Sequence, residues 1–151
     1  MAETKLKNNQ AVKLTVGAYA YPSASTSCTN VTYTQITLGN EAYDIGGDFD
    51  TANSKFVAPV DGYYQINAAV NLSSVADGSR IICAVYKNGG EILNGQTTMG
   101  KSTDNSSTIA GMFYLSAGDE IKLYCYQDSG TAQGTTTNAS RTFLNVVLVG
   151  T

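Results

Sequence analysis

The residue types that most often carry out chemistry are sparse in this sequence. Its 151 residues include no histidine, although histidine is the commonest general base and a frequent zinc ligand. Nucleophile systems that depend on an imidazole are therefore excluded. Asp119 and Glu120 are adjacent, so they point to opposite faces of an extended chain and cannot share one substrate. No pair of carboxylates is placed for glycoside hydrolysis, and the composition favours a protein that is not an enzyme.

Three aspartates lie close together in the segment YDIGGDFD. Asp44, Asp48 and Asp50 could supply carboxylate oxygens to a calcium ion from a bent loop. The spacing does not match the helix-loop-helix calcium motif, because an isoleucine and two glycines occupy key places. The alternative is that these acids are solvated turn residues, and the sequence favours it. Apart from this weak calcium hypothesis, no cofactor is expected.

The three cysteines, Cys28, Cys83 and Cys125, form no CxxC motif, so no metal knuckle or redox motif is present. Cys83 and Cys125 each lie in an apolar segment typical of a strand. They are expected to be small apolar core residues. A disulfide between Cys83 and Cys125 stays open as the alternative, although the odd third cysteine counts slightly against it.

The charge content restricts the classes of partner. Only 14 % of residues are charged and the formal net charge is −3, against roughly 25 % charged residues in an average soluble domain. A nucleic-acid partner needs clustered lysine and arginine, and no basic cluster exists. No apolar run approaches the ~20 residues of a membrane-spanning helix. We therefore expect neither nucleic-acid binding nor membrane insertion.

Short strand-like segments recur every eight to twelve residues, which is the spacing of a sandwich or barrel. No window of helical length keeps a period of 3.6 residues. Glycine, threonine and tyrosine favour strands and turns over a long helix. Strands are expected at 12–16, 31–38, 43–50, 55–58, 63–72, 80–86, 91–98, 107–115, 120–127 and 141–149. This pattern predicts one all-β domain, a ten-stranded antiparallel jelly roll at 12–151, preceded by a polar arm at 1–11.

The segment FDTANSKFVAPVDGYYQINAAV resembles the central signature of the globular head of complement subcomponent q and its tumour-necrosis-factor-like relatives. The matching positions are Phe49-Asp50, Lys55-Phe56, Ala58-Pro59-Val60, Gly62, Tyr64 and Ile66. Three later segments, VYKNGG, YLSAGDEIKLYCYQ and RTFLNVVLVGT, resemble family strands in the same order. The resemblance runs from about residue 12 to residue 151.

The resemblance implies a ten-stranded jelly roll that assembles as a compact homotrimer. Animal members often carry a Gly-X-Y collagen stalk, and this sequence shows neither such a stalk nor a convincing secretion signal. Similar domains occur as knobs on bacteriophage fibres and other virion appendages, and on bacterial surface filaments. The serine- and threonine-rich chain is most similar to this microbial group.

The last strand also indicates association, independently of the resemblance. Residues 142–149 are apolar on both faces, whereas an antiparallel strand usually has one polar face that is exposed to solvent. One apolar face of this strand packs in the core of its own chain, and the other is expected to be covered by another subunit. The alternative is that a loop of the same chain covers it. Outward tyrosines fit an interface, because tyrosine combines apolar area with a hydroxyl group. The predicted trimer interface comprises Tyr63, Gln65, Ala69, Tyr124, Tyr126, Leu144, Val146 and Leu148.

Two loops without large side chains, 100–108 and 128–140, are candidates for recognition of a cell-surface glycan or protein. Their candidate residues are Lys101, Asp104, Asn105, Asp128, Gln133 and Asn138. The alternative is a solubilising rim.

We expect a trimeric virion structural or appendage protein, a phage fibre knob or capsid decoration, whose arm 1–11 docks to other virion proteins. The alternative is an extracellular or cell-surface ligand-binding trimer of a bacterium.

Overall fold

The structure, a computed structural model, describes residues 15–100 and 105–151. Every regular element in these ranges is a β-strand, and all the named strand pairs are antiparallel. The elements are β1 (Gly17–Tyr21), β2 (Ser27–Cys28), β3 (Thr34–Gln35), β4 (Asn40–Ile45), β5 (Phe49–Asp50), β6 (Lys55–Val57), β7 (Gly62–Leu72), β8 (Arg80–Lys87), β9 (Gly90–Thr98), β10 (Asn105–Leu115), β11 (Glu120–Gln127), β12 (Gln133–Gly134) and β13 (Phe143–Gly150).

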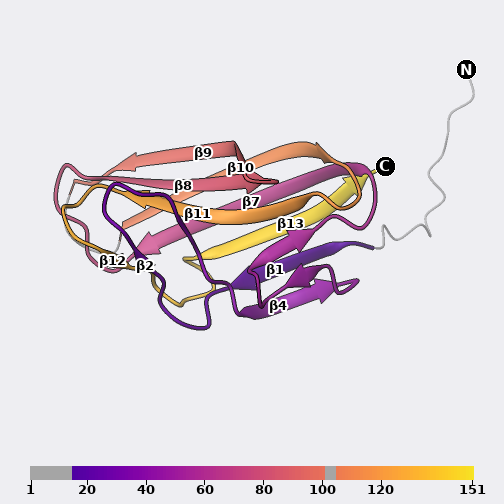
Figure 1. Cartoon of the computed structure of the whole chain (residues 1–151), viewed down its shortest axis with the longest axis horizontal. Helices are drawn as coiled ribbons and strands as arrows, with labels where there is room; N and C mark the ends of the chain where they lie inside the picture. Colours follow the sequence, from indigo (N-terminus) through magenta and orange to yellow (C-terminus); the bar gives the residue numbers. More distant parts are fainter. Residues whose placement is uncertain (1–14, 101–104) are drawn as a thin grey trace, which may run out of the picture.

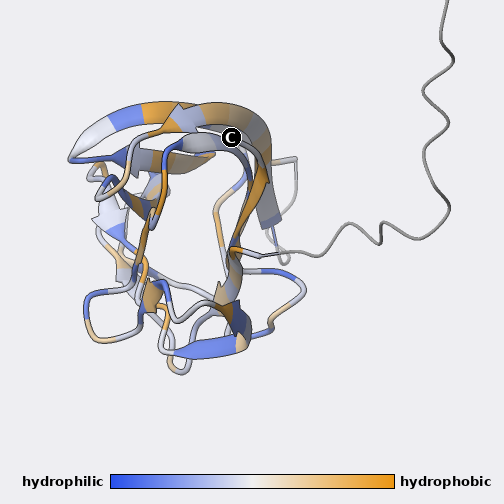
Figure 2. Cartoon of the chain, turned by 90° about the vertical axis from the view of Figure 1, so that its right-hand side faces the viewer, coloured by the Kyte–Doolittle hydropathy of each residue, from blue (hydrophilic) through white to orange (hydrophobic). Residues whose placement is uncertain are grey.

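The strands form a two-layered jelly roll (Figure 1). The first sheet has the order β10-β7-β13-β1-β4, and the second sheet has the order β5-β6-β11-β8-β9, with β3 paired to β11. The short pair β12-β2 forms a third, two-stranded sheet. Figure 2, turned by 90° from Figure 1, shows the strands arranged around a common centre. Within the described ranges, no helix is long and apolar enough to cross a membrane.

The core lies between the two sheets and follows the two-residue period of their strands. In β7, Tyr64, Ile66 and Ala68 are buried, while Tyr63 is exposed. In β11, Ile121 alternates in the same way with half-buried neighbours. Burial of each large apolar side chain contributes roughly 1.5–3 kcal/mol to folding. The alternation therefore fixes which side of each sheet remains free for other contacts.

The predicted jelly roll is confirmed, and the strands at 63–72, 80–86, 91–98, 107–115 and 120–127 lie where the pattern places them. Other predictions differ from the structure. No strand was predicted at Gly17–Tyr21, where β1 lies; of the predicted strand 12–16, residues 15–16 are not in a strand and residues 12–14 lie outside the described ranges. The predicted strand 43–50 is divided into β4 and β5 by the turn at 46–48. Within 31–38 only Thr34–Gln35 pairs as a strand, opposite Tyr124 and Cys125 of β11, and backbone hydrogen bonds from Val31 and Ile36 to β11 lie on either side of this short pair.

The three cysteines are free thiols buried in the core. Cys83 and Cys125 lie directly opposite each other on β8 and β11, yet they form no disulfide. Burial raises the pKa of the Cys83 thiol. The hydrogen bond with Cys28 and burial raise the pKa of the Cys125 thiol. The expectation that these residues act as small apolar core side chains is confirmed, and the disulfide alternative is not supported.

Candidate interaction face

Four neighbouring strands of the first sheet carry no charged residue. β10, β7, β13 and β1 contain no aspartate, glutamate, lysine or arginine. The second sheet differs, because β6, β8, β9 and β11 all contain charged residues. We call the outer surface of β10, β7, β13 and β1, the side turned away from the core, together with Tyr43 of the neighbouring β4, the uncharged face; β4 itself carries Glu41 and Asp44 at the edge of the sheet. Such a surface keeps little of the charge that normally discourages protein association.

The uncharged face gathers most of the exposed large apolar side chains. Of the seven in the described residues, five lie on its strands, and Val31 and Val60 lie outside strands. The five are Tyr43, Tyr63, Met112, Tyr114 and Val149. Large exposed apolar groups that cluster on one surface are typical of an interaction site.

The ring packing at one end of the face is specific. Tyr63 on β7 is paired with Tyr114 on β10, and the ring centroids lie 5.3 Å apart in an edge-to-face arrangement. Both side chains are about half exposed, at 54 % and 50 %. Met112 lies two residue pairs further along the same two strands, opposite Gln65 and on the same side of the sheet. This end of the face is a preformed apolar surface.

A polar row crosses the middle of the uncharged face. Gln65 Nε2 donates to Asn67 Oδ1 at 3.1 Å, and Asn67 Nδ2 donates to Asn145 Oδ1 at 3.2 Å. Asn145 Nδ2 then donates to the Tyr43 hydroxyl at 2.6 Å and to the carbonyl of Ala18 at 3.1 Å. We call Gln65, Asn67, Asn145 and Tyr43 the polar row. It joins side chains from β7, β13 and β4 into one connected network.

Tyr19 anchors the side of the face near β1. Its ring stacks on Phe143 with centroids 4.9 Å apart, and its hydroxyl donates to the carbonyl of Ala139 at 2.6 Å. Burial, and then the neighbouring Tyr43, raise the pKa of Tyr19. The hydroxyl therefore remains protonated and acts as a hydrogen-bond donor at neutral pH. This contact holds the segment before β13 against the first sheet.

The outer surface of the second sheet has a different chemistry. Tyr33, Tyr86, Tyr124 and Tyr126 form a chain of ring contacts with centroid separations between 4.3 and 5.9 Å. The Arg80 guanidinium lies 5.4 Å from the centre of the Tyr126 ring. We call this surface the tyrosine face. It combines aromatic rings with charged groups, and it lies on the opposite side of the sandwich from the uncharged face.

The acidic residues near the turn 116–119 are occupied by structural contacts. Asp119 Oδ2 lies 2.6 Å from Lys87 Nζ and accepts the backbone amide of Ser116 at 2.8 Å. The hydrogen bond from Lys87 and that backbone amide lower the pKa of Asp119 to about 2. Asn88 adds a further donor to Asp119. These contacts join the turns at the ends of β8 and β10 and leave Asp119 as a structural anion.

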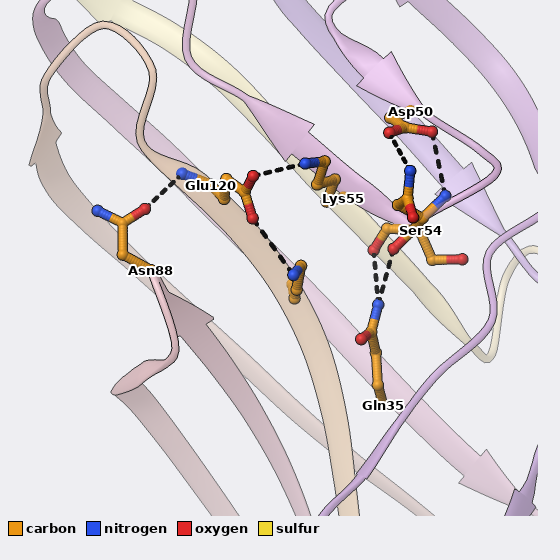
Figure 3. Close-up of polar contacts among 8 residues, drawn as sticks. Gln35, Asp50, Ser54, Lys55, Asn88 and Glu120 are labelled. Atoms are coloured by element: carbon orange, nitrogen blue, oxygen red, sulfur yellow. Dashed lines mark hydrogen bonds and ion pairs between the residues drawn. The ribbon is translucent and has the colours of Figure 1, made fainter.

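The carboxylate of Glu120 has different partners from that of Asp119. Figure 3 shows its carboxylate between Lys55 and a second amino group, while Asn88 contacts its backbone nitrogen. The second amino group is that of Lys122, whose Nζ lies 3.2 Å from Glu120. The hydrogen bond from Lys55, and then that from Lys122, lower the pKa of Glu120. The expected separation of the two acids is confirmed by these different partners.

The calcium hypothesis is not supported. Among residues 15–100 and 105–151, no group of three or more acidic, histidine or cysteine side chains could hold a metal ion. Asp44 instead accepts the backbone amides of Asp48 and Phe49 at 3.0 and 3.1 Å. Asp50 accepts both the backbone and the side-chain nitrogen of Asn53 (Figure 3). The carboxylates of Asp44 and Asp50 therefore close turns. The pKa of Asp48 is raised by burial and, to a smaller extent, by the nearby charge of Asp44.

The segment 128–140 is tied to the sandwich by hydrogen bonds, and its role in recognition stays a prediction. Asp128 pairs with Arg80, with Nε and Oδ2 2.7 Å apart. Gln133 belongs to β12 and pairs with Cys28 on β2. Asn138 accepts the backbone amide and hydroxyl of Ser140. These contacts order the segment and hold its partly exposed polar groups in place.

The sequence prediction overlooked the residue that organises this segment. Gln127 is 0 % exposed, although glutamine is usually a surface residue. Its Nε2 donates to the carbonyls of Cys28 and Thr131, and its Oε1 accepts two bonds from Ser129. Its position in the alternation of β11, with Ile121, Leu123 and Cys125 on the same side, is the signal that could have indicated an inward side chain.

Part of the predicted trimer interface was wrong because those residues are buried within one chain. Leu144 and Val146 are each 1 % exposed and belong to the core between the sheets. Leu148 packs against the same core. Ala69 is 2 % exposed beneath its cross-strand neighbours on β10 and β13. The side of β13 that can meet another subunit therefore carries Asn145 and its alternating neighbours.

The other predicted interface residues separate onto opposite surfaces. Tyr63 and Gln65 lie on the uncharged face. Tyr124 and Tyr126 lie on the tyrosine face and cannot share one flat contact with them. Asn105 begins β10 opposite Leu72. The candidates Lys101 and Asp104, like the arm 1–11, lie outside the described residues.

Comparison with known proteins gives one family match. The family model of the C1q domain matches residues 18–144, most of the chain. An uncharacterized protein of Bacillus subtilis, YqcC, is 24 % identical over 110 residues, which cover 66 % of this chain and 29 % of YqcC. The chain thus matches less than a third of the length of this curated relative.

Solved structures share the fold at low sequence identity. Murine APRIL superposes with a TM-score of 0.68 at 18 % identity, covering 89 % of this chain and 98 % of APRIL. The Eiger TNF of S. frugiperda gives 0.69 at 10 % identity, covering 91 % and 94 % of the two chains. The globular domain of zebrafish complement 1qA gives 0.68 at 13 % identity, covering 89 % and 97 %.

Proposed function

The chain belongs to the C1q domain family, and from this premise we propose that it is a non-enzymatic module that assembles into a homotrimer through its uncharged face. The observation that carries the proposal is the absence of charge from four adjacent strands whose outer surface exposes aromatic and methionine side chains. Water solvates such a surface poorly, so covering it is favourable. The resemblance of the sequence to trimeric relatives agrees with this assignment.

A second copy of this chain is the partner that fits the face best. A charged partner would find no opposite charge on β10, β7, β13 or β1. Identical copies bring the same charges to their contact, and these strands contribute none that could repel. In a closed trimer the face of one copy meets a neighbouring part of the next copy, and its aromatic and aliphatic side chains can pack there at no electrostatic cost. The chemistry of the face therefore supports self-association over capture of an acidic or basic protein.

The assembled module is proposed to be a head carried by a larger structure. In YqcC the similar region is less than a third of the protein, which supports use of this domain as one part of a longer chain. We assign it to a virion appendage or capsid decoration, where trimer formation gives stability and the remaining surface can contact a host. A secreted or surface-bound bacterial trimer is the second candidate. Head and tail genes beside the coding sequence would favour the virion assignment.

Solution mass tests self-association. Multi-angle light scattering of the whole chain is expected to give three times the subunit mass of 15.9 kDa. Met112→Glu, on the uncharged face, is expected to give monomer, because it places three like charges within the assembly. Val31→Glu is the matched control, since Val31 is 60 % exposed but outside the strands. A monomeric wild type, or equal masses for the two variants, would overturn the proposal.

A further inference from the structure

The polar row is an unusual component of the uncharged face. Around it lie apolar groups that can pack in many relative positions, such as Met112 and Phe143. We propose that the polar row sets the register in which copies of the chain dock, and this inference rests on the proposed self-association. The Gln65 end of the row in one copy pairs with the Tyr43 end of the row in the next copy, a head-to-tail contact that can close around three copies. The apolar groups then supply affinity, and the row supplies specificity.

The row is already ordered in the single chain. Asn67 and Asn145 are direct cross-strand partners on β7 and β13, and Asn145 also bonds to the backbone of Ala18. Each side-chain amide donates to the next group, so the row has one direction, from Gln65 to Tyr43. Preformed side chains lose little further freedom on binding. The row is therefore a fixed pattern of donors and acceptors rather than a set of mobile polar groups.

The two ends of the row retain complementary capacity. Among the described residues, Gln65 Oε1 accepts no hydrogen bond, and the Tyr43 hydroxyl accepts one but has no acceptor for its own hydrogen. A second copy carries the same acceptor and the same donor. A docking arrangement that removes water from these groups without pairing them leaves polar atoms unsatisfied, which opposes association.

This requirement distinguishes correct from shifted contacts. Sliding one apolar surface over another changes its packing gradually, whereas sliding the row breaks its pairing at once. A single polar side chain in an apolar interface is known to specify register and oligomeric state at a cost in stability. Here four connected side chains from three strands occupy that role. The row excludes alternative assemblies more than it strengthens the correct one.

The test replaces the centre of the row by apolar side chains. The double variant Asn67→Val with Asn145→Val is expected to stay associated but to lose its single stoichiometry. Native mass spectrometry would show several oligomers in place of one. The control is Gln96→Val with Thr98→Val, exposed positions of β9 on the other sheet, which should keep one species. One unchanged species from the row variant would overturn the inference.

A milder variant keeps the inference testable if the double variant does not fold. Tyr43→Phe removes only the hydroxyl at one end of the row, and circular dichroism checks that the β-structure is retained. Subunit exchange between two differently tagged samples is expected to be about tenfold faster, the effect of losing roughly one hydrogen bond in an interface. An unchanged exchange rate would overturn the inference alone, whereas a monomeric wild type would overturn the proposed self-association as well.

Discussion

Leu144 and Asn145 are consecutive residues of β13 that point to opposite sides of the first sheet. Leu144 is 1 % exposed in the core, while Asn145 belongs to the polar row on the outer surface. Leu144 therefore contributes to the stability of the single chain, whereas the adjacent Asn145 is proposed to contribute to the contact between chains. Substitutions at these two positions should change different properties.

Leu144→Ala is expected to lower the free energy of unfolding by about 2–5 kcal/mol, because it leaves a cavity between the sheets. Urea unfolding at one fixed protein concentration measures the change. Val60→Ala is the control, since Val60 is 40 % exposed and lies outside the strands. It should change stability by no more than about 0.5 kcal/mol. Equal, small effects of both substitutions would show that Leu144 is not a core residue.

Asp119→Asn tests the ion pair with Lys87. The native pKa of Asp119, about 2, lies below its ordinary value, so its ionised form stabilises the fold above about pH 4. That contribution disappears as pH falls from about 4 to 2. The variant should be less stable at pH 7 by about 1–2 kcal/mol, and its stability should fall less steeply in that acid range. Thermal unfolding at pH 7, 4 and 2.5 measures both effects.

Asp77→Asn supplies the control for this pH series, because Asp77 is an exposed turn acid. Its stability should follow that of the wild-type protein at each pH. If Asp119→Asn did the same, the contacts of Asp119 with Lys87, Ser116 and Asn88 would contribute nothing measurable to stability.

The thiols offer a test of the core. Cys28, Cys83 and Cys125 are fully buried, and the raised pKa values of Cys83 and Cys125 reduce their reactive thiolate form. The folded protein is expected to resist a thiol reagent such as DTNB at pH 8. In denaturant without reductant, all three cysteines of the sequence should react. If only one thiol reacted in denaturant, two of the three cysteines would be joined in a disulfide.

Gly95→Ala tests the contact between β9 and β10, which belong to different sheets. A Cβ atom at Gly95 would clash with the Ile109 side chain and would lie 2.9 Å from the carbonyl oxygen of Thr108. Strain of this kind typically costs about 1–3 kcal/mol. The control is Gly90→Ala, where the nearest atom lies 3.6 Å away. Urea unfolding should show a loss at Gly95 only, and equal losses would contradict the close approach.

Much of the fold could be predicted because local patterns and burial agree in its long strands. In β7 and β11 apolar residues alternate with polar or tyrosine residues, and turn residues bound both strands. The strand Gly17–Tyr21 escaped prediction because its sequence, GAYAY, contains small residues and no β-branched residue. Ala18 and Ala20 are buried there because the sheet places them inside. Tertiary packing decided this strand, not intrinsic propensity.

The candidate site was harder to predict, because it depends on which face of each strand meets the core. Both faces of β13 are apolar at its ends, so the pattern could not decide that Leu144 points inward. The polar row joins Asn145 to Tyr43, which are 102 positions apart in the chain. Loop 128–140 looks featureless in sequence, since its order comes from hydrogen bonds to β2 and to the buried Gln127. Such relationships appear only once the strand order is known.

The lack of charge on β10, β7, β13 and β1 also affects how fast the subunits would meet. Charged surfaces attract one another over a distance and can raise association rate constants far above the 10⁵–10⁶ M⁻¹s⁻¹ or so of neutral encounters. These four strands provide no such steering, so collision and correct orientation alone would control the encounter. Newly folded subunits would then remain single for a time set by their concentration, and local synthesis of many copies would shorten that exposed stage.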